Sequence, residues 1–383
     1  MSTRVLAFFD TLYQTAPQAV ALNRGQSRWD RLRAARPLSR AHAPLNLPGS
    51  LGSYDLADPG QAAMVAAFAG AAGLSGFVVT CHPTAEGYWT GTDTLVPALG
   101  RGFGLAYQWC PADDPWWQAA DGASREARAR ELIASLRRGP AVLADGRPIL
   151  VVDRPRSLGD PSSTIALLRD AAAEAGLGGL YLIAAKAEQG AAQGPGWDAL
   201  VDPSPGAWAS CDPVNAPGGG EALEVAAGLR DSSELTDRYF IYTLFLISRM
   251  IDRARRGKVF PRVFPYYQDW ASHPEGGATL LFSRSLLGSN LVSCPTFGRF
   301  VETGMTYAAE TFAPSERFCF LDSWNHWLDG SQVEPSVLDG DLVYNTLRDA
   351  ITKARFTIAT GSGASHAIDP SLRRLAEAAC MAR

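Results

Sequence analysis

Residues 146–184 read GRPILVVDRPRSLGDPSSTIALLRDAAAEAGLGGLYLIA and contain two short apolar runs on either side of a helical segment. The runs PILVV (148–152) and GLYLIA (179–184) are continuously apolar, which is typical of strands buried on both faces. Between them, residues 162–175 have the pattern of a helix that ends at Gly176. This order predicts a parallel β-α-β unit.

The same alternation of apolar runs and helical segments continues over most of the chain. Six more runs of strand length are residues 5–9, 76–80, 104–109, 199–202, 259–267 and 318–322. Further helical segments are residues 61–72, 124–138, 232–256, 297–312 and 341–354. Eight strands with interleaved helices predict a single (β/α)8 barrel of the α/β class over residues 1–383, with residues 355–383 as a C-terminal extension. Long loops at residues 10–60 and 203–220 are expected over the C-terminal face of the strands. The alternative is an open, doubly wound sheet, but no GxGxxG motif follows the first run.

Composition and charge exclude several classes of protein. The chain has 35 Lys and Arg against 39 Asp and Glu, a net charge of −4, and 46% of its residues are hydrophobic. This is an ordinary globular composition, so we expect no binding to nucleic acid. The first residues lack the cleavage site of a secretory signal, and the longest apolar run, 239–247, is too short to span a membrane. The six cysteines form no CxxC pair, which argues against disulfides and a structural zinc site. We therefore expect a cytoplasmic protein that uses no cofactor or metal ion.

The densest group of chemically capable residues is DSWNHWLDGSQVEP, residues 322–335, directly after the last apolar run. In a barrel this segment lies at the C-terminal end of a strand, where active sites of this fold are built. His326 and Asp329 are three residues apart and meet if the turn is helical. Trp324 and Trp327 beside them suit a sugar, whose C–H faces stack on indole rings. The alternative is that both indoles pack in the core and the charges are solvated on a loop.

Two stretches of the chain resemble a known family. Residues 324–335, WNHWLDGSQVEP, resemble the WNEW-x-EG-x-x-LEP signature of the WbsX-type, glycoside hydrolase family 99-like proteins. Residues 29–56 resemble a second block of that family, EWTNV…KPLF…H…P.LP.DLG.YDL. The family includes bacterial polysaccharide-biosynthesis proteins and, more distantly, endo-α-mannosidases. The resemblance implies a (β/α)8 barrel that cleaves or forms glycosidic bonds in bacterial surface-polysaccharide metabolism, with a saccharide or glycoconjugate as substrate.

The sequence departs from the family at the two acids of the signature. In the family the acid after the Asn acts, in the hydrolases, as a base toward the sugar's own 2-hydroxyl, and the acid three residues later is the general acid. Here these positions hold His326 and Asp329, which predicts His326 as base, Asp329 as acid and a bell-shaped pH profile. Glu334 keeps a family carboxylate and is a third catalytic candidate, or a residue that closes the loop before Pro335. Because the Glu pair is lost, the alternative is a catalytically silent barrel that binds a glycan or an assembly partner.

The remaining candidates are predicted contacts to the sugar. His42 falls in the second family block, and His82 follows the second strand, where the family carries a similar segment. Trp109 and Asp113 follow the third strand, and a metal held by Asp113 and its neighbour Asp114 is a weaker alternative. The other predicted contacts, all at or near strand ends, are Asp269, Trp324, Asn325 and Trp327.

Overall fold

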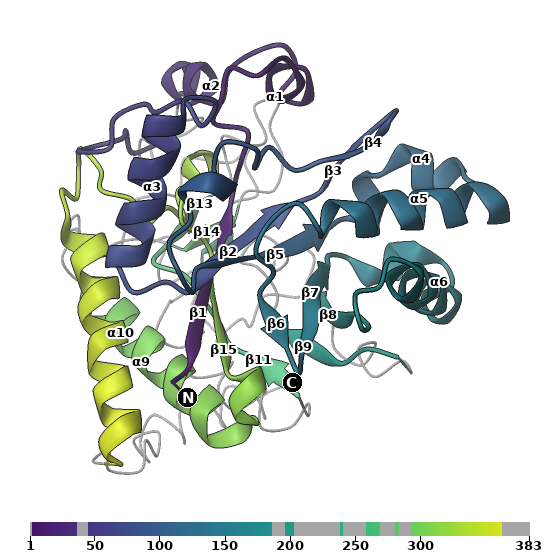
Figure 1. Cartoon of the computed structure of the whole chain (residues 1–383). Helices are drawn as coiled ribbons and strands as arrows, with labels where there is room; N and C mark the ends of the chain where they lie inside the picture. Colours follow the sequence, from purple (N-terminus) through teal and green to yellow (C-terminus); the bar gives the residue numbers. More distant parts are fainter. Residues whose placement is uncertain are drawn as a thin grey trace.

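The structure is a computed structural model that describes residues 2–36, 45–185, 196–202, 258–268 and 293–361, with the backbone of residues 238–239 and 280–282. Figure 1 shows α3 and α10 on one side of the strands and α4, α5 and α6 on the other. The parallel strands are, in spatial order, β11 (Val259–Phe260), β9 (Ala199–Val201), β8 (Tyr181–Ala185), β7 (Arg147–Val152), β5 (Gly104–Trp109), β2 (Gly76–Thr80), β1 (Arg4–Phe9), β15 (Phe318–Leu321) and β12 (Arg262–Val263).

The two ends of this sheet are joined by a single interrupted strand. β11 pairs with β9, and β12 pairs with β15, yet only Pro261 separates β11 from β12. Proline has no N–H to continue a ladder, but its carbonyl oxygen accepts a hydrogen bond from the N–H of Phe320 at 2.8 Å. β11 and β12 thus act as one strand that closes the sheet, and the predicted (β/α)8 barrel is confirmed.

Helices alternate with the strands as the sequence predicts. They are α1 (Pro17–Leu22), α2 (Arg28–Ala34), α3 (Pro59–Ala71), α4 (Pro115–Ala119), α5 (Gly122–Ser135), α6 (Pro161–Glu174), α9 (Ser293–Thr311) and α10 (Leu342–Thr360). The helix predicted over 232–256 lies outside the described residues. Because α10 runs to Thr360, the expected boundary of a C-terminal extension at 355 falls inside a helix, and the division of the chain into domains stays a prediction.

Smaller elements complete the fold. The short strands are β3 (His82–Thr84), β4 (Gly87–Trp89), β6 (Leu143–Ala144), β10 (Arg238–Tyr239), β13 (Tyr267–Gln268) and β14 (Leu280–Phe282). The 3-10 helices are η1 (Val96–Ala98), η2 (Pro111–Asp113), η3 (Pro155–Leu158), η6 (Pro314–Glu316) and η7 (Trp327–Asp329). β3 and β4 form a hairpin directly after β2, and η7 follows β15, so both extend the C-terminal ends of barrel strands.

Side chains of the barrel strands alternate between two buried clusters. On β1, Leu6 and Phe8 belong to a cluster with Phe320 of β15 inside the barrel. Val5 and Phe9, on the opposite face, belong to a larger cluster that includes residues of the surrounding helices. The strands are therefore covered on both faces, which is why their sequences are continuously apolar.

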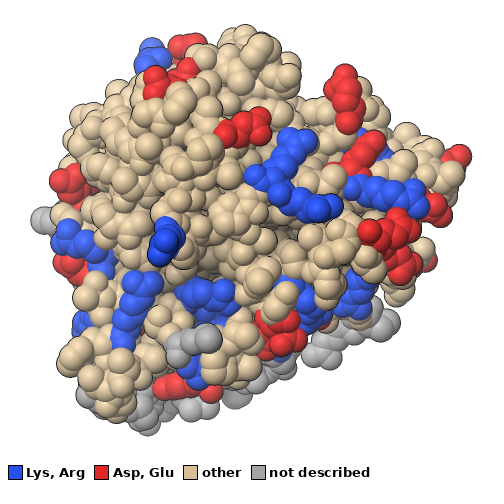
Figure 2. Space-filling view, viewed as in Figure 1, with Lys and Arg blue, Asp and Glu red and all other residues tan. Residues whose placement is uncertain are grey.

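Helices α1 and α2, from the long segment after β1, lie over the C-terminal end of the barrel, as expected. Figure 1 shows α1 and α2, both from this segment, beyond the end of β1. Within the described ranges, no helix is both long and apolar enough to cross a membrane. Figure 2 shows acidic and basic side chains mixed over one face, as the near-balanced composition predicts.

Candidate active site

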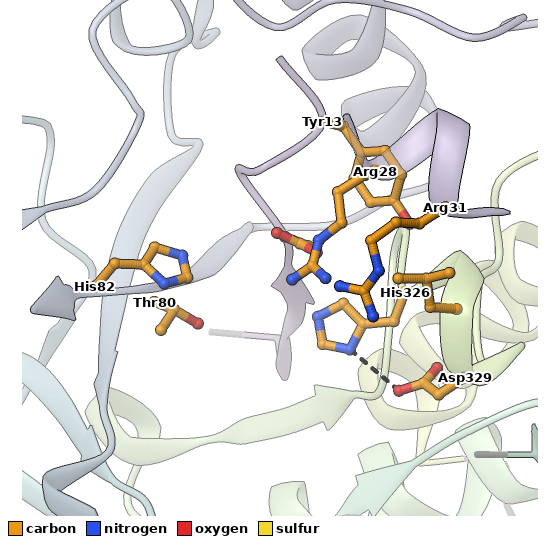
Figure 3. Close-up of a pocket in the computed structure, with 9 residues that line it drawn as sticks. Tyr13, Arg28, Arg31, Thr80, His82, His326 and Asp329 are labelled. Atoms are coloured by element: carbon orange, nitrogen blue, oxygen red, sulfur yellow. Dashed lines mark ion pairs between the residues drawn. The ribbon is translucent and has the colours of Figure 1, made fainter. Parts of the chain in front are cut away.

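A cavity of about 230 Å³ opens where the C-terminal ends of β1, β2 and β15 meet beneath α2 (Figure 3). It is lined by Asp10, Tyr13, Arg28, Arg31, Thr80, His82, His326, Leu328 and Asp329. This is the end of a (β/α)8 barrel at which active sites are built. Three of the residues predicted from the sequence, His82, His326 and Asp329, are brought together here.

His326 and Asp329 lie side by side because the chain after β15 turns into η7. The N–H of His326 donates to Ser323 Oγ at 2.8 Å, and Asp329 Oδ1 accepts from the hydroxyl of Ser331 at 2.6 Å. His326 Nδ1 is 3.6 Å from Asp329 Oδ2 and 3.7 Å from Asp322 Oδ1. Figure 3 marks the first of these ion pairs.

The surroundings of His326 favour its protonated form. Burial lowers the pKa of an imidazole, but the neighbouring charges of Asp329, Asp322 and Asp10 outweigh burial and raise the pKa of His326 above its usual value. Its side chain is 29% exposed, so the ring remains accessible from the cavity. His326 therefore stays protonated to a higher pH than a free imidazole does.

His82 has the opposite environment. It begins β3 directly after β2, and its buried Nε2 atom has no hydrogen-bond partner among the described residues. Burial lowers the pKa of His82 to about 4, with Asp10 opposing this shift and Arg28 adding to it. In Figure 3 His82 stands apart from His326, on the β2 side of the cavity. At neutral pH His82 is uncharged.

Asp10, which follows β1, places a carboxylate in the cavity that the sequence analysis did not single out. Asn325 Oδ1 accepts from the Asp10 N–H at 2.8 Å, and Asn325 Nδ2 donates to the Asp10 carbonyl at 2.9 Å. The Asp10 carboxylate is 2.9 Å from Arg28 Nε. Burial alone raises the pKa of Asp10, but Arg28, His326 and the Leu12 N–H together lower this pKa below its usual value. The predicted sugar contact Asn325 thus positions Asp10, which stays ionised.

Arg28 and Arg31 are also functional candidates that sequence reasoning missed. They lie in the segment predicted as a loop, but residues 28–34 form α2, which Ser27 caps by accepting from the Asp30 N–H at 3.0 Å. Asp10 could have been predicted from the sequence, since it directly follows the first strand in the same way that His82 follows the second. No sequence pattern indicated the two arginines, because their position over the cavity comes from the tertiary fold.

Glu334 lies behind the cavity rather than in its lining. Its buried carboxyl accepts hydrogen bonds from Tyr54 Oη at 2.9 Å and from Trp327 Nε1 at 2.9 Å. Trp29 Nε1 in turn donates to the Tyr54 carbonyl at 2.6 Å. Burial raises the pKa of Glu334 to about 8, although both hydrogen bonds oppose the shift. The two sequence stretches that carry the family resemblance are therefore joined to each other through this carboxyl.

The remaining predicted contacts lie elsewhere. The indole rings of Trp109, Trp324 and Trp327 are fully buried and do not line the cavity. Asp113 is exposed and forms an ion pair with Arg154. His42 and Asp269 lie outside the described residues.

The carboxylates after β5 have separate structural partners. Asp114 is buried, accepts from Trp109 Nε1 at 3.2 Å, and caps α4 by accepting from the Trp117 N–H at 3.0 Å. Asp113 instead faces Arg154. In the part of the chain that the structure describes, no three His, Cys, Asp or Glu side chains come together as metal ligands.

Comparison with known proteins connects this site to a family. Residues 117–346 match the family model described as "Glycosyltransferase WbsX". Two proteins named "Uncharacterized protein WxcX", from two strains of Xanthomonas campestris pv. campestris, are 24% and 23% identical to the chain and align with 91% of it. The chain spans about half the length of these curated relatives, 50% in each case.

Two solved structures share the fold. One, described as "Glycoside hydrolase-like protein", is 14% identical, has a TM-score of 0.56, and aligns over 91% of this chain and 94% of that one. A GH99 endo-alpha-mannosidase from Bacteroides thetaiotaomicron, in complex with BIS-TRIS-propane, is 12% identical with a TM-score of 0.54, over 93% and 98% of the two chains. At these identities the likeness is one of fold. The family model, by contrast, covers more than half of the chain and includes the segment of His326 and Asp329. The chain therefore belongs to the family described as "Glycosyltransferase WbsX".

Proposed function

We propose that the protein is an enzyme that forms a glycosidic bond by transferring a sugar to an acceptor hydroxyl, in the assembly of a bacterial surface polysaccharide. The observation that carries this proposal is the pair of histidines in one cavity whose pKa values are shifted in opposite directions. Such a split supplies a proton donor and a proton acceptor at the same pH. A cytoplasmic location for this activity stays a prediction.

Transfer is favoured over hydrolysis by the spacing of the signature residues. Glycosidases hold two carboxyl groups across the bond, roughly 5–5.5 Å apart in retaining and about 6.5–9.5 Å apart in inverting enzymes. Here the first acid is replaced by His326, whose Nδ1 is only 3.6 Å from Asp329. A pair this close acts as one unit, in which the carboxylate orients and charges the imidazole.

The roles follow from these environments. His326 donates its proton to the leaving-group oxygen as the bond from that oxygen to the sugar carbon breaks. The acceptor oxygen forms the new bond to the same carbon and gives its proton to the uncharged imidazole of His82, which lines the cavity. The Asp10 carboxylate stabilises the positive charge that develops on the sugar. Asp329 is a positioning residue for His326. These roles differ from those expected from the sequence, in which His326 is the base and Asp329 is the acid.

The test is to incubate the full chain separately with a panel of nucleotide-sugar donors plus glycan acceptors and with a panel of aryl glycosides. The proposal expects transfer from a donor, with little release of aryl alcohol. His326→Gln should lower transfer by about 10²-fold or more, the usual range for a general acid. Asp349→Asn is a matched control for changes at Asp329, because Asp349 lies exposed on α10 and, of the residues that the structure describes, pairs only with its neighbour Arg348.

Two outcomes would contradict the proposal. Efficient hydrolysis of aryl glycosides without transfer would make the protein a hydrolase. Turnover of neither panel, together with hydrolysis that appears in the double variant His326→Glu with Asp329→Glu, would instead support a silent glycan-binding barrel.

A further inference from the structure

We propose that Arg31, supported by Arg28, forms a subsite for an anionic group, a phosphate or a carboxylate, on the saccharide that enters the cavity. This inference rests on the proposed function, since it names the chemical class of substrate for the same cavity. It is carried by the placement of two arginines and by the pairing of charges around them.

Both arginines reach the cavity from one face of α2. Residues three apart on a helix are neighbours, so Arg28 and Arg31 project in the same direction. Both side chains line the cavity. In Figure 3 their guanidinium groups lie next to each other and point toward His326.

The carboxylates around the cavity already have cationic partners. Asp10 is 2.9 Å from Arg28, and Asp329 is 3.6 Å from His326. Behind them, Asp322 accepts from Arg262 at 2.7 Å. Among the described residues that line the cavity, no acidic side chain is therefore left over to balance a further cation.

Arg31 is that further cation. It donates to the neutral amide oxygen of Asn23 at 2.8 Å, and no described carboxylate lies within ion-pair distance of its guanidinium. Burial lowers the pKa of Arg31, and the positive charges of Arg28 and Arg24 lower it further, while Tyr13 and the more distant carboxylate of Asp10 oppose this shift without reversing it. The guanidinium stays charged, because the ordinary pKa of an arginine lies far above neutral pH. A bound anion would relieve this repulsion.

The chemistry of the Arg31 guanidinium limits the classes of ligand that the subsite can bind. A guanidinium presents a planar fork of N–H donors that matches the paired oxygens of a phosphate or carboxylate. The cavity volume of about 230 Å³ lies below the roughly 300–1,000 Å³ of drug-sized sites, which favours one sugar unit with its charged substituent. The neutral His82 and the His326–Asp329 pair remain available for the sugar itself.

The test measures binding, so it does not depend on turnover. Glucose, galactose and mannose are each titrated into the full chain calorimetrically as the neutral sugar, the 1-phosphate and the uronic acid. For at least one of these sugars, a charged form should bind about tenfold or more tightly than the neutral parent. This preference should weaken as salt is raised from about 0.01 M to 0.15 M. Preference for the 1-phosphate would identify a donor phosphate, and preference for the uronic acid would identify an acidic sugar.

Variants assign the preference to Arg31. Arg31→Gln should remove most of this preference and lower the affinity for the charged form much more than that for the neutral sugar, and Arg31→Lys should keep part of it because the charge remains. Arg33→Gln is the matched control, since Arg33 lies on the same helix but pairs with Asp30 and donates to Ser53 outside the cavity. Thermal unfolding of each variant checks that the fold is intact.

The proposal is overturned if no charged form binds better than its neutral parent, or if the preference survives in Arg31→Gln. Transfer activity that is unaffected by Arg31→Gln would remove the subsite and leave the proposed function in place. Anion-selective binding that depends on Arg31, in a protein that turns over neither panel, would keep the subsite and remove the proposed function.

Discussion

The side-chain amide of Asn325 forms two hydrogen bonds with the backbone of Asp10, 315 residues earlier in the sequence: its Oδ1 accepts from the Asp10 N–H and its Nδ2 donates to the Asp10 carbonyl. Its Nδ2 also donates to Tyr54 Oη at 2.9 Å, and Tyr54 in turn donates to Glu334. The signature segment after β15 therefore fixes the end of β1 and the segment before α3 at the same time. These two hydrogen bonds hold the backbone of Asp10 so that its carboxylate faces the cavity.

Replacing Asn325 by Ala should cost both stability and activity. The substitution removes the partner of the part-buried N–H and C=O groups of Asp10, and a fully buried group left unpaired costs about 1–3 kcal/mol. We expect the free energy of unfolding, measured by urea titration, to fall by about 2–4 kcal/mol. At urea concentrations below the midpoint of unfolding, where the variant is folded, we expect a lower rate of transfer. An Asn325→Ala protein with wild-type stability would show that the amide is not what holds Asp10.

The pH profile distinguishes the two possible roles of His326. If His326 is the proton donor, it must be protonated, so the rate should fall as the pH rises through its raised pKa, above the usual value of about 6.5. On the acid side, the rate should hold until His82 is protonated near pH 4. His326→Gln should remove the basic limb together with most of the rate. A rate that instead falls as the pH drops through 7 and 6 would support the base role expected from the sequence.

Asp329→Asn tests the positioning role directly. Without the negative charge of Asp329, the pKa of His326 should fall and the basic limb of the profile should move to lower pH. We expect the maximal rate to fall about tenfold, since the imidazole also loses its nearest partner, 3.6 Å away. The ring protons of His326, followed by NMR titration, report this pKa without turnover. An unmoved titration in Asp329→Asn, matching that of Asp349→Asn, would contradict the assignment.

Glu334 should make the fold less stable as the pH rises. Its pKa is about 8 in the folded protein and near its ordinary value of 4.5 when unfolded, so the folded state binds the extra proton between these values. The contribution of Glu334 to the free energy of unfolding is then greatest below pH 4.5 and is lost progressively up to about pH 8. We expect the free energy of unfolding of the wild type to fall by about 2–4 kcal/mol more than that of Glu334→Gln between pH 5 and 8. Parallel curves for the two proteins would show that the carboxyl is ionised throughout.

Gly76→Ala should disturb the packing of β2 against β5. A Cβ at this position would overlap the carbonyl oxygen of Gly104 on the neighbouring strand, and backbone atoms in a sheet cannot yield as a side chain does. We expect a loss of about 1–3 kcal/mol, the usual cost of overpacking. Gly70→Ala is the matched control, because Gly70 lies in α3 with open space around it and should be neutral or stabilised by about 0.5–1 kcal/mol. Equal denaturation midpoints for the two variants would contradict the explanation.

The sequence by itself determined the barrel. Each predicted strand of the barrel overlaps an observed one, and the runs at 76–80 and 104–109 coincide with β2 and β5. This was possible because burial on both faces imposes a local signal, a short continuous apolar run, at every strand. The same local reasoning, that functional groups follow the ends of parallel strands, singled out His82, His326 and Asp329, which all line the cavity.

The tertiary structure alone decided which residues face that cavity. Trp324, Trp327 and Glu334 belong to the signature segment, yet their side chains turn into the core, whereas Arg28 and Arg31 reach the cavity from a stretch that was predicted as a loop. The direction of a side chain after a strand end depends on contacts such as the one between Asn325 and Asp10, which join residues hundreds of positions apart. The opposite pKa shifts of His82 and His326 have the same origin, because burial and neighbouring charge are properties of the folded chain and not of the residue type.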